Sequence, residues 1–172
     1  MFSDPVKNIA QSGIIPCMEV ADFGAGSGAL VFAAAKAMLS TGRVYAVDVQ
    51  QELLSKIKNN AVREGIYNVE VILGDIEIPK GSKLRDNFID FVLLSNILFQ
   101  VENKNNVIEE ARRILKPGCA VLVVDWSDSF GGIGPKLEMV VKKETVLEMM
   151  EKNGFHLDRE ISAGAHHYGI IM

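Results

Sequence analysis

The sequence lacks features that mark several large classes of protein. Its only two cysteines, Cys17 and Cys119, lie far apart with no metal-type spacing, which goes against a disulfide framework and a cysteine-ligated metal. No apolar run is long enough to span a membrane, and the start Met1–Pro5 lacks the basic region and apolar core of a signal peptide. We therefore expect free thiols and a cytoplasmic protein.

An excess of positive charge is also missing. The 172 residues carry a formal net charge of −4, so no overall positive field would hold a polyanion, and nucleic acid is disfavoured as a substrate. No nucleophile motif or metal-ligand cluster is evident, and we expect no metal.

The sequence shows no linkers and no repeats. The length suits one domain over residues 1–172, with residues 1–14 as a short N-terminal helix that forms part of a lid.

Three alternate glycines, Gly24, Gly26 and Gly28, directly follow an apolar segment and precede an alanine-rich one. Glycine allows backbone angles that side chains forbid and lets a ligand approach the main chain closely. The amides and the positive dipole end of the following helix would face whatever lies in the turn. The pattern predicts a strand, a tight turn and a helix that together bind a nucleotide-like ligand.

Apolar segments alternate with amphipathic ones along the rest of the chain, which predicts an α/β fold: an open, doubly wound, Rossmann-like parallel sheet with helices on both faces. We expect strands over Met18–Phe23, Arg43–Asp48, Val69–Leu73, Ile89–Ser95 and Cys119–Trp126, with shorter ones over Phe155–Ile161 and Tyr168–Met172. We expect helices between Asp4 and Gly13, over Leu30–Leu39 up to Ser40–Gly42, over Gln50–Glu64, over Lys104–Leu115 up to Lys116–Gly118, and over Thr145–Lys152.

Each of the first five strands ends in a polar group, where ligands of such sheets bind. Asp48 lies about twenty residues past the turn, where an acid can accept from two ribose hydroxyls or cap the next helix. Asp75 can accept from an adenine amino group, with Ile76 as an amide and an apolar wall, or form a turn with Gly74. Asp22 can reach the ligand or brace the turn.

The ordered segments Val20–Gly28, Val44–Asp48, Gly74–Asp75, Asp90–Asn96 and Ile114–Gly118 resemble the class I S-adenosylmethionine-dependent methyltransferases, most of all the small-molecule branch with the ubiquinone and menaquinone biosynthesis enzymes. The resemblance implies S-adenosyl-L-methionine as cofactor and a seven-stranded sheet whose antiparallel last strand lies between the fifth and sixth. It places Gly24 and Gly26 at the methionine part, Asp48 at the ribose, Asp75 and Ile76 at the adenine, and Ser95 at the amino acid end. The full cofactor set expected is Asp22, Gly24, Ala25, Gly26, Gly28, Asp48, Val49, Asp75, Ile76 and Ser95.

The expected reaction is an in-line displacement that transfers a methyl group to a small-molecule acceptor, so the protein mainly aligns the reactants and excludes water. Asn96 is a candidate to orient the acceptor, or else caps a loop. Asp125 is a candidate base, although an acid at a strand end more often binds backbone amides. His166 and His167 are expected to be structural. The glycine-rich loop Phe130–Pro135 is a mobile wall over the acceptor or a plain connection.

Two other functions fit parts of the pattern. A nicotinamide-dependent oxidoreductase shares the glycine turn and the ribose acid, and Ala29 loosely satisfies its spacing, but it has no need for Gly74–Asp75 or Lys116–Gly118. A cofactor-binding module without catalysis fits the short N-terminal segment, since only about eighteen residues precede the first strand. A homo-oligomer is compatible with the sequence, and no membrane partner is expected.

Overall fold

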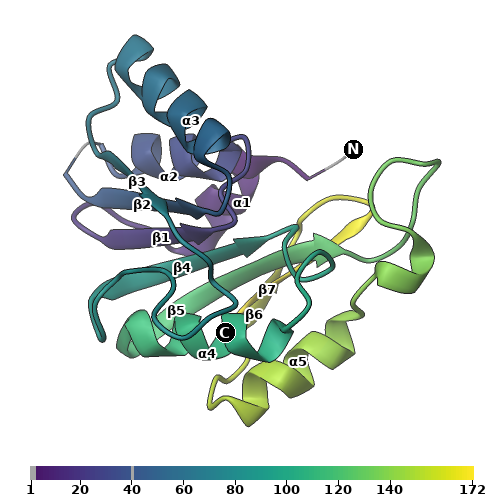
Figure 1. Ribbon diagram of the computed structural model, residues 1–172. Coiled ribbons are helices and arrows are strands. Elements are labelled where there is room, and N and C mark those ends of the chain that lie inside the picture. Colours follow the sequence, from purple (N-terminus) through teal and green to yellow (C-terminus); the bar gives the residue numbers. More distant parts are fainter. Residues whose placement is uncertain (1–2, 40) are drawn as a thin grey trace.

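The computed structural model describes residues 3–39 and 41–172 and contains a seven-stranded sheet in the order β3-β2-β1-β4-β5-β7-β6 (Figure 1). The first five strands pair in parallel, and β7 lies antiparallel between β5 and β6. This confirms the sheet expected from the sequence. The strands are β1 (Glu19–Phe23), β2 (Arg43–Asp48), β3 (Val69–Leu73), β4 (Ile89–Ser95), β5 (Leu115–Trp126), β6 (Arg159–Ile161) and β7 (His167–Ile171).

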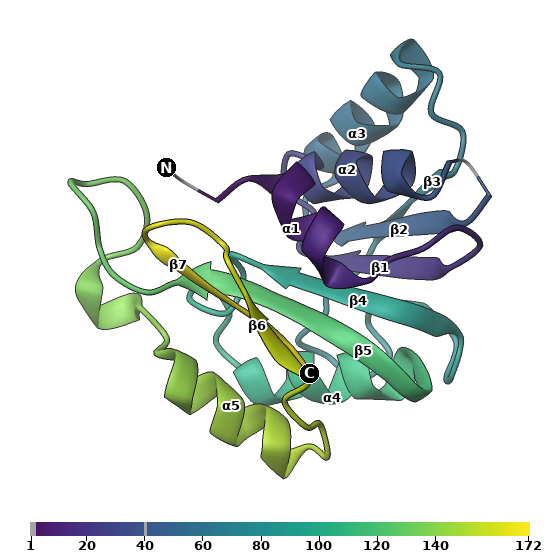
Figure 2. The same ribbon diagram turned by 180° about the vertical axis from the view of Figure 1, so that it is seen from behind.

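Helices cover both faces of the sheet, as Figures 1 and 2 show from opposite sides. They are α1 (Pro5–Ser12), α2 (Ala29–Ala37), α3 (Gln51–Arg63), α4 (Lys104–Ile114) and α5 (Lys143–Lys152), with a short 3₁₀ turn at Leu137–Met139. Alternate residues of the central strands divide between two cores, because successive side chains of a strand point to opposite faces. Val20 packs with the face of α1, α2 and α3, and Ala21 with the face of α4 and α5.

Two element boundaries differ from the sequence expectation by more than two residues. The strand expected from Cys119 begins at Leu115, so Lys116–Gly118 lies within β5 instead of separating it from α4. Pairing jumps from Ile89 with Leu115 to Phe91 with Ala120, which makes this stretch a bulge. Gly118 supplies its left-handed backbone at φ 78°. The strand expected from Phe155 begins only at Arg159, because the Phe155 amide donates to the Met150 carbonyl of α5 at 3.1 Å and not to a strand.

The N-terminal helix α1 is held at both ends. Asp4 caps it by accepting from the amides of Val6 and Lys7, at 3.0 and 3.3 Å. Gln11 exchanges two hydrogen bonds of 3.1 Å with the backbone of Ser162 in the β6–β7 turn, and the Arg159 guanidinium donates to the carbonyls at the end of the helix. The domain expected over residues 1–172 includes residues 1, 2 and 40, which lie outside the described ones. The helix end expected at Ser40–Gly42 likewise includes residue 40.

Among the described residues, none of the helices is both long and apolar enough to cross a membrane.

Candidate functional site

The glycine turn between β1 and α2 has the geometry that the sequence indicated. Gly24, Gly26 and Gly28 all have left-handed backbones, with φ of 72°, 51° and 82°. A Cβ on Gly24 would lie 2.5 Å from Ile97 Cδ1, and one on Gly28 would lie 2.8 Å from Ile57 Cγ1. No described side chain caps α2, which begins with Gly28 at its N-cap. The first-turn amides of α2 therefore remain as donors for an anionic group.

Asp48 joins this turn to the next strand. Its Oδ2 accepts from the Gly26 amide at 2.9 Å and its Oδ1 from the Gln50 amide at 2.9 Å, and the residue is 7% exposed. Gln50 is the N-cap residue of α3, and no described side chain accepts from the first-turn amides of that helix, so Asp48 forms a turn before α3 and not the helix cap considered as its alternative role. Each carboxylate oxygen can accept more than one hydrogen bond, so the same group can also accept from ligand hydroxyls.

Two cavities of about 240 Å³ each meet at Gly24 and Gly26. Cavity A lies between the turn, α1 and the end of β4, and cavity B lies between the turn and the ends of β2 and β3. Cavity A is lined by Ser3, Pro5, Asn8, Asp22, Gly24, Ala25, Gly26, Ser27, Ala29, Leu30, Ser95, Asn96 and Gln100. Cavity B is lined by Gly24, Gly26, Val47, Asp48, Val49, Gln50, Leu53, Gly74, Asp75, Ile76, Glu77, Ile97, Gln100 and Val101.

Nearly all the residues expected at the cofactor site lie in these two walls. Asp22, Ala25 and Ser95 line cavity A, whereas Asp48, Val49, Asp75 and Ile76 line cavity B. Gly28 lines neither cavity and instead allows the close approach of α2 to α3. The candidate catalytic residue Asn96 lines cavity A, and the other candidate, Asp125, lines neither cavity.

The two acids at the ends of β1 and β3 differ in their surroundings. Asp22 is 3% exposed, and burial, followed by repulsion from Asp48, raises the pKa of its carboxyl to about 8. Asp75 accepts from the Glu77 amide at 2.9 Å through one oxygen, so it forms the turn considered as its alternative role. Gly74 has no room for a side chain, because a Cβ there would lie 2.4 Å from the Gly81 carbonyl.

Asp125 braces the end of β4 instead of facing a cavity. It is 1% exposed, and its two oxygens accept from the amides of Leu98 and Trp126 at 3.0 and 2.8 Å. Burial raises the pKa of this carboxyl to about 6, although the backbone amides favour its charged form. These contacts match the amide-binding role and give no support to the role of base.

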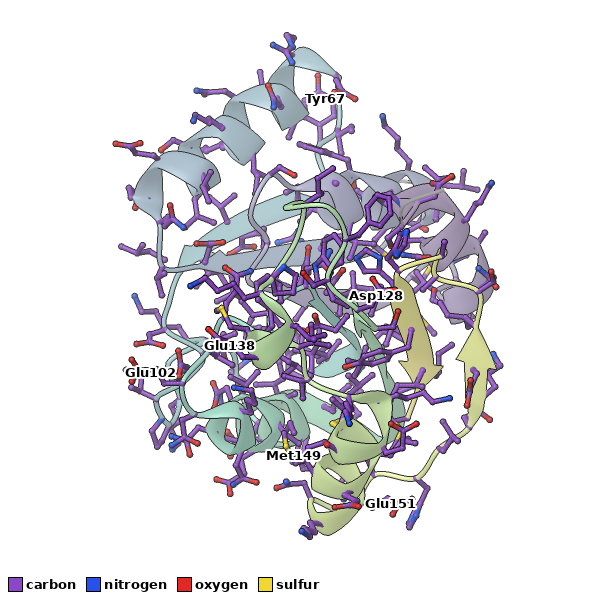
Figure 3. All side chains as sticks on the ribbon, turned by 90° about the vertical axis from the view of Figure 1, so that its right-hand side faces the viewer. Tyr67, Glu102, Asp128, Glu138, Met149 and Glu151 are labelled. Carbon is purple, nitrogen blue, oxygen red and sulfur yellow. The ribbon has the colours of Figure 1, made fainter. Side chains whose placement is uncertain are left out.

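A second group of polar and aromatic residues lies in the loop after β5. Asp128, labelled in Figure 3, holds His166 Nδ1 at 2.9 and 3.1 Å from its two oxygens, and the Phe130 ring stacks on His166 with centroids 4.2 Å apart. His167 packs against Trp126 with ring centroids 4.3 Å apart, and burial lowers the pKa of its imidazole. In the described part of the chain no cluster of three or more His, Cys, Asp or Glu could hold a metal.

Comparison with known proteins decides the family. A family model described as a methyltransferase domain matches residues 16–165. The chain belongs to this methyltransferase family. The resemblance to class I S-adenosylmethionine-dependent methyltransferases is thereby confirmed, and the match goes against the oxidoreductase alternative.

Several relatives of this methyltransferase domain are known. It is 32% identical over 119 residues to the ubiquinone/menaquinone biosynthesis C-methyltransferase UbiE of Burkholderia multivorans, covering 69% of this chain and 47% of that protein. The chain thus spans about half the length of the curated relatives it matches. A crystal structure of a SAM-dependent methyltransferase from Aquifex aeolicus is 28% identical with a TM-score of 0.88, covering 99% of this chain and 89% of that one. The [4+2]-cyclase SpnF, 19% identical with a TM-score of 0.76 over 92% of this chain and 58% of that one, shares the fold.

The sequence predicted the N-terminal helix as part of a lid but did not single out the two α1 residues that line cavity A, Pro5 and Asn8. Asn8 lines cavity A and is 1% exposed. It also lines cavity C, a space of about 420 Å³ formed with Asp4, Lys7 and the turn residues Ser162–Ala165. The sequence offered one signal for Asn8, namely a polar residue next to Ile9 on the side of a short helix that is expected to be buried. A polar residue on such a stripe more often caps or braces than binds a ligand.

Proposed function

We propose that the chain binds S-adenosyl-L-methionine across cavities A and B and transfers its methyl group to a small molecule by in-line displacement. The observation that carries this proposal is the meeting of the two cavities at Gly24 and Gly26. A ligand that passes over these glycines can place one end among the acids of β2 and β3 and the other at the start of α2. A nucleoside joined to an amino acid has this shape.

The nucleoside part suits cavity B. Asp48 would accept from the two ribose hydroxyls while it keeps its bonds to Gly26 and Gln50. The Asp75 carboxylate would accept from the adenine amino group, with Ile76 and Val49 as apolar walls. The sequence resemblance and the cavity lining both support these assignments.

The amino acid part suits cavity A. The uncapped amides at the start of α2 would bind its carboxylate, since a helix N-terminus favours an anion. Ser95, Ala25 and Asp22 lie in the same wall and would complete the enclosure. Gly28 would act through the close packing of α2 and not by contact with the ligand.

We propose that the acceptor enters through cavity C, which adjoins cavity A at Asn8. In the transfer, an electron pair of the acceptor atom forms a bond to the methyl carbon as the sulfur takes the electron pair of its breaking C–S bond. The protein then contributes alignment and exclusion of water. Asp125 would position the loop after β4 through its bonds to Leu98 and Trp126 instead of taking a proton.

The small-molecule class rests on the formal net charge of −4, on the small volumes of the cavities and on similarity to UbiE, which is described as a ubiquinone/menaquinone biosynthesis C-methyltransferase. The homo-oligomer and the cytoplasmic location stay predictions from the sequence.

Titration calorimetry with S-adenosylmethionine, S-adenosylhomocysteine and NADH tests the cofactor, and a screen of acceptors with detection of S-adenosylhomocysteine tests the transfer. We expect both adenosyl compounds to bind and NADH not to. Binding of NADH alone would overturn the proposal. Cofactor binding without product from any acceptor would favour a non-catalytic module, and the shared fold of a cyclase shows that the fold by itself does not fix the chemistry.

A further inference from the structure

Two buried side-chain oxygens in the wall of cavity A have no hydrogen-bond donor among the described residues. They are Asn8 Oδ1, from α1, and Asn96 Oδ1, from the end of β4. Buried polar atoms are almost always hydrogen-bonded, and leaving one without a partner costs free energy. Two such atoms beside one cavity indicate a ligand that supplies donors.

Hydrogen bonds fix the backbone around both asparagines. Asn8 is 1% exposed, its Nδ2 donates to Ser3 Oγ at 2.8 Å, and Gln11 ties α1 to the β6–β7 turn. The Asn96 amide donates to the Val124 carbonyl at 2.8 Å, and the Asn96 carbonyl accepts from Gln100 Nε2 at 2.6 Å. The oxygen of Asn8 is therefore held at cavity A before any ligand binds, and the half-buried Asn96 keeps its backbone beside the same cavity.

The chemistry of this wall selects the ligand group. An amide oxygen only accepts, and the neighbouring Asp22 carboxylate, which lines the same cavity, adds a third acceptor when it is ionised. A primary ammonium carries three N–H donors and a positive charge. The uncapped amides at the start of α2 belong to the same cavity and favour an anion. A cavity that offers both acceptors and a helix N-terminus suits the zwitterion of an α-amino acid.

We propose that Asn8 and Asn96 bind the α-ammonium group of the cofactor's amino acid part, so that α1 is a direct component of the cofactor site. This inference rests on the proposed function. It assigns Asn96 to the binding of the methyl donor, whereas the sequence made this residue a candidate to orient the acceptor. Since Asn8 also lines cavity C, the bound cofactor would hold one wall of the acceptor entrance in place.

Calorimetry on the full chain tests this with two ligands. S-Adenosylhomocysteine carries the ammonium group, whereas 5′-methylthioadenosine shares the nucleoside but lacks the amino acid. For Asn8→Ala we expect S-adenosylhomocysteine to bind about ten- to a hundred-fold more weakly, because a hydrogen bond to a charged group is lost. The affinity for 5′-methylthioadenosine should stay within about two-fold, which also shows that the variant folds.

Asn8→Asp gives the sharper result, because the ligand group beside residue 8 decides whether the affinity for S-adenosylhomocysteine rises or falls. A carboxylate beside an ammonium should hold or strengthen the binding of S-adenosylhomocysteine, while one beside the ligand carboxylate should weaken it about ten-fold or more. Weakening by Asn8→Asp with unchanged binding of 5′-methylthioadenosine would overturn the ammonium assignment. Equal affinity of wild type and Asn8→Ala for S-adenosylhomocysteine would overturn any contact of Asn8 with the cofactor.

Asn68 provides the matched control. It is 6% exposed, its Oδ1 is likewise buried without a donor in the described part of the chain, and it lines a separate cavity at the other edge of the sheet. Asn68→Ala and Asn68→Asp should leave both affinities unchanged. If they lower the affinities as much as the Asn8 variants do, the effect is general and the inference fails. Should wild type itself bind neither ligand, the proposed function fails first, and the two failures remain distinguishable.

Discussion

The carboxylate of Asp48 and the amide of Gly26 lie 2.9 Å apart and join the end of β2 to the glycine turn. The contact explains how one acid serves two purposes. The Asp48 carboxylate fixes the position of the glycine turn beside cavity B, and it lies at the position proposed for the ribose. We expect a substitution of Asp48 to lower ligand affinity more than it lowers stability.

Asp48→Asn tests this relationship. The new amide nitrogen cannot accept from Gly26 or Gln50, and the ribose hydroxyls lose a charged acceptor. We expect the affinity for S-adenosylhomocysteine, measured by calorimetry, to fall about ten- to a hundred-fold. Glu70→Gln, which alters an exposed ion pair between Glu70 of β3 and Arg43 of β2, should leave this affinity unchanged. Unaltered affinity in Asp48→Asn would mean that the ribose lies elsewhere.

Asp22 should make stability depend on pH. Burial, then Asp48, raises its pKa from 3.8 to about 8, so the native state binds more protons than the unfolded state between these values. Unfolding free energy attributable to this group therefore falls as pH rises from about 4 to about 8. Asp22→Asn should remove that slope and be more stable than wild type at pH 8, by an amount on the order of a few kcal/mol.

Urea unfolding across this pH range measures the Asp22 effect. Above about pH 8, where the Asp22 carboxyl of wild type is ionised, the same variant should bind S-adenosylmethionine more weakly, because it lacks a charged acceptor in cavity A. A parallel pH slope in wild type and variant would show that Asp22 is ordinarily ionised in the folded protein.

Gly28 and Gly65 separate backbone strain from steric clash. Both have left-handed backbones, at φ 82° and 67°, but a Cβ on Gly28 would meet Ile57 at 2.8 Å, whereas one on Gly65 would meet nothing within 4 Å. We expect Gly65→Ala to cost about 1 kcal/mol and Gly28→Ala clearly more, about 2–4 kcal/mol. Equal costs by urea unfolding would mean that α2 and α3 are not closely packed at this turn.

Glu110 holds the loop between β3 and β4 from the buried face of α4. It is 3% exposed and accepts from Ser82, from the Lys80 amide and from Arg113. Although its burial acts the other way, the hydrogen bonds of Arg113 and Ser82 lower the pKa of this carboxyl to about 2. The stabilisation it gives is complete above about pH 4.5 and is lost as pH falls toward 2.

Glu110→Gln should destabilise the protein at pH 7 by about 2–4 kcal/mol, since Arg113 loses a buried partner. The difference from wild type should shrink below pH 4. Thermal unfolding at pH 7 and pH 3 measures both values, and a difference that is constant with pH would contradict the ion pair.

The sequence indicated the parts of the site that a local pattern carries. Asp48 and Asp75 were identifiable because they end apolar strands, and parallel strands bring their carboxyl ends to one edge. The presence of Asn8 and Asn96 in the lining of one cavity was not, because it depends on how α1 packs. The bulge at Lys116–Gly118 was missed for a related reason: proline and glycine break a helix, yet a strand edge with shifted register also accommodates them. The bracing role of Asp125 became clear only from the amides that surround it.

A crystal structure of the chain with S-adenosylhomocysteine tests the central claim most directly. We expect the adenine beside Asp75 and Ile76 in cavity B, the ribose hydroxyls at Asp48, and the amino acid part in cavity A beneath α1. Electron density for the nucleoside in cavity A, or a bound ligand that makes no contact with the glycine turn, would contradict it.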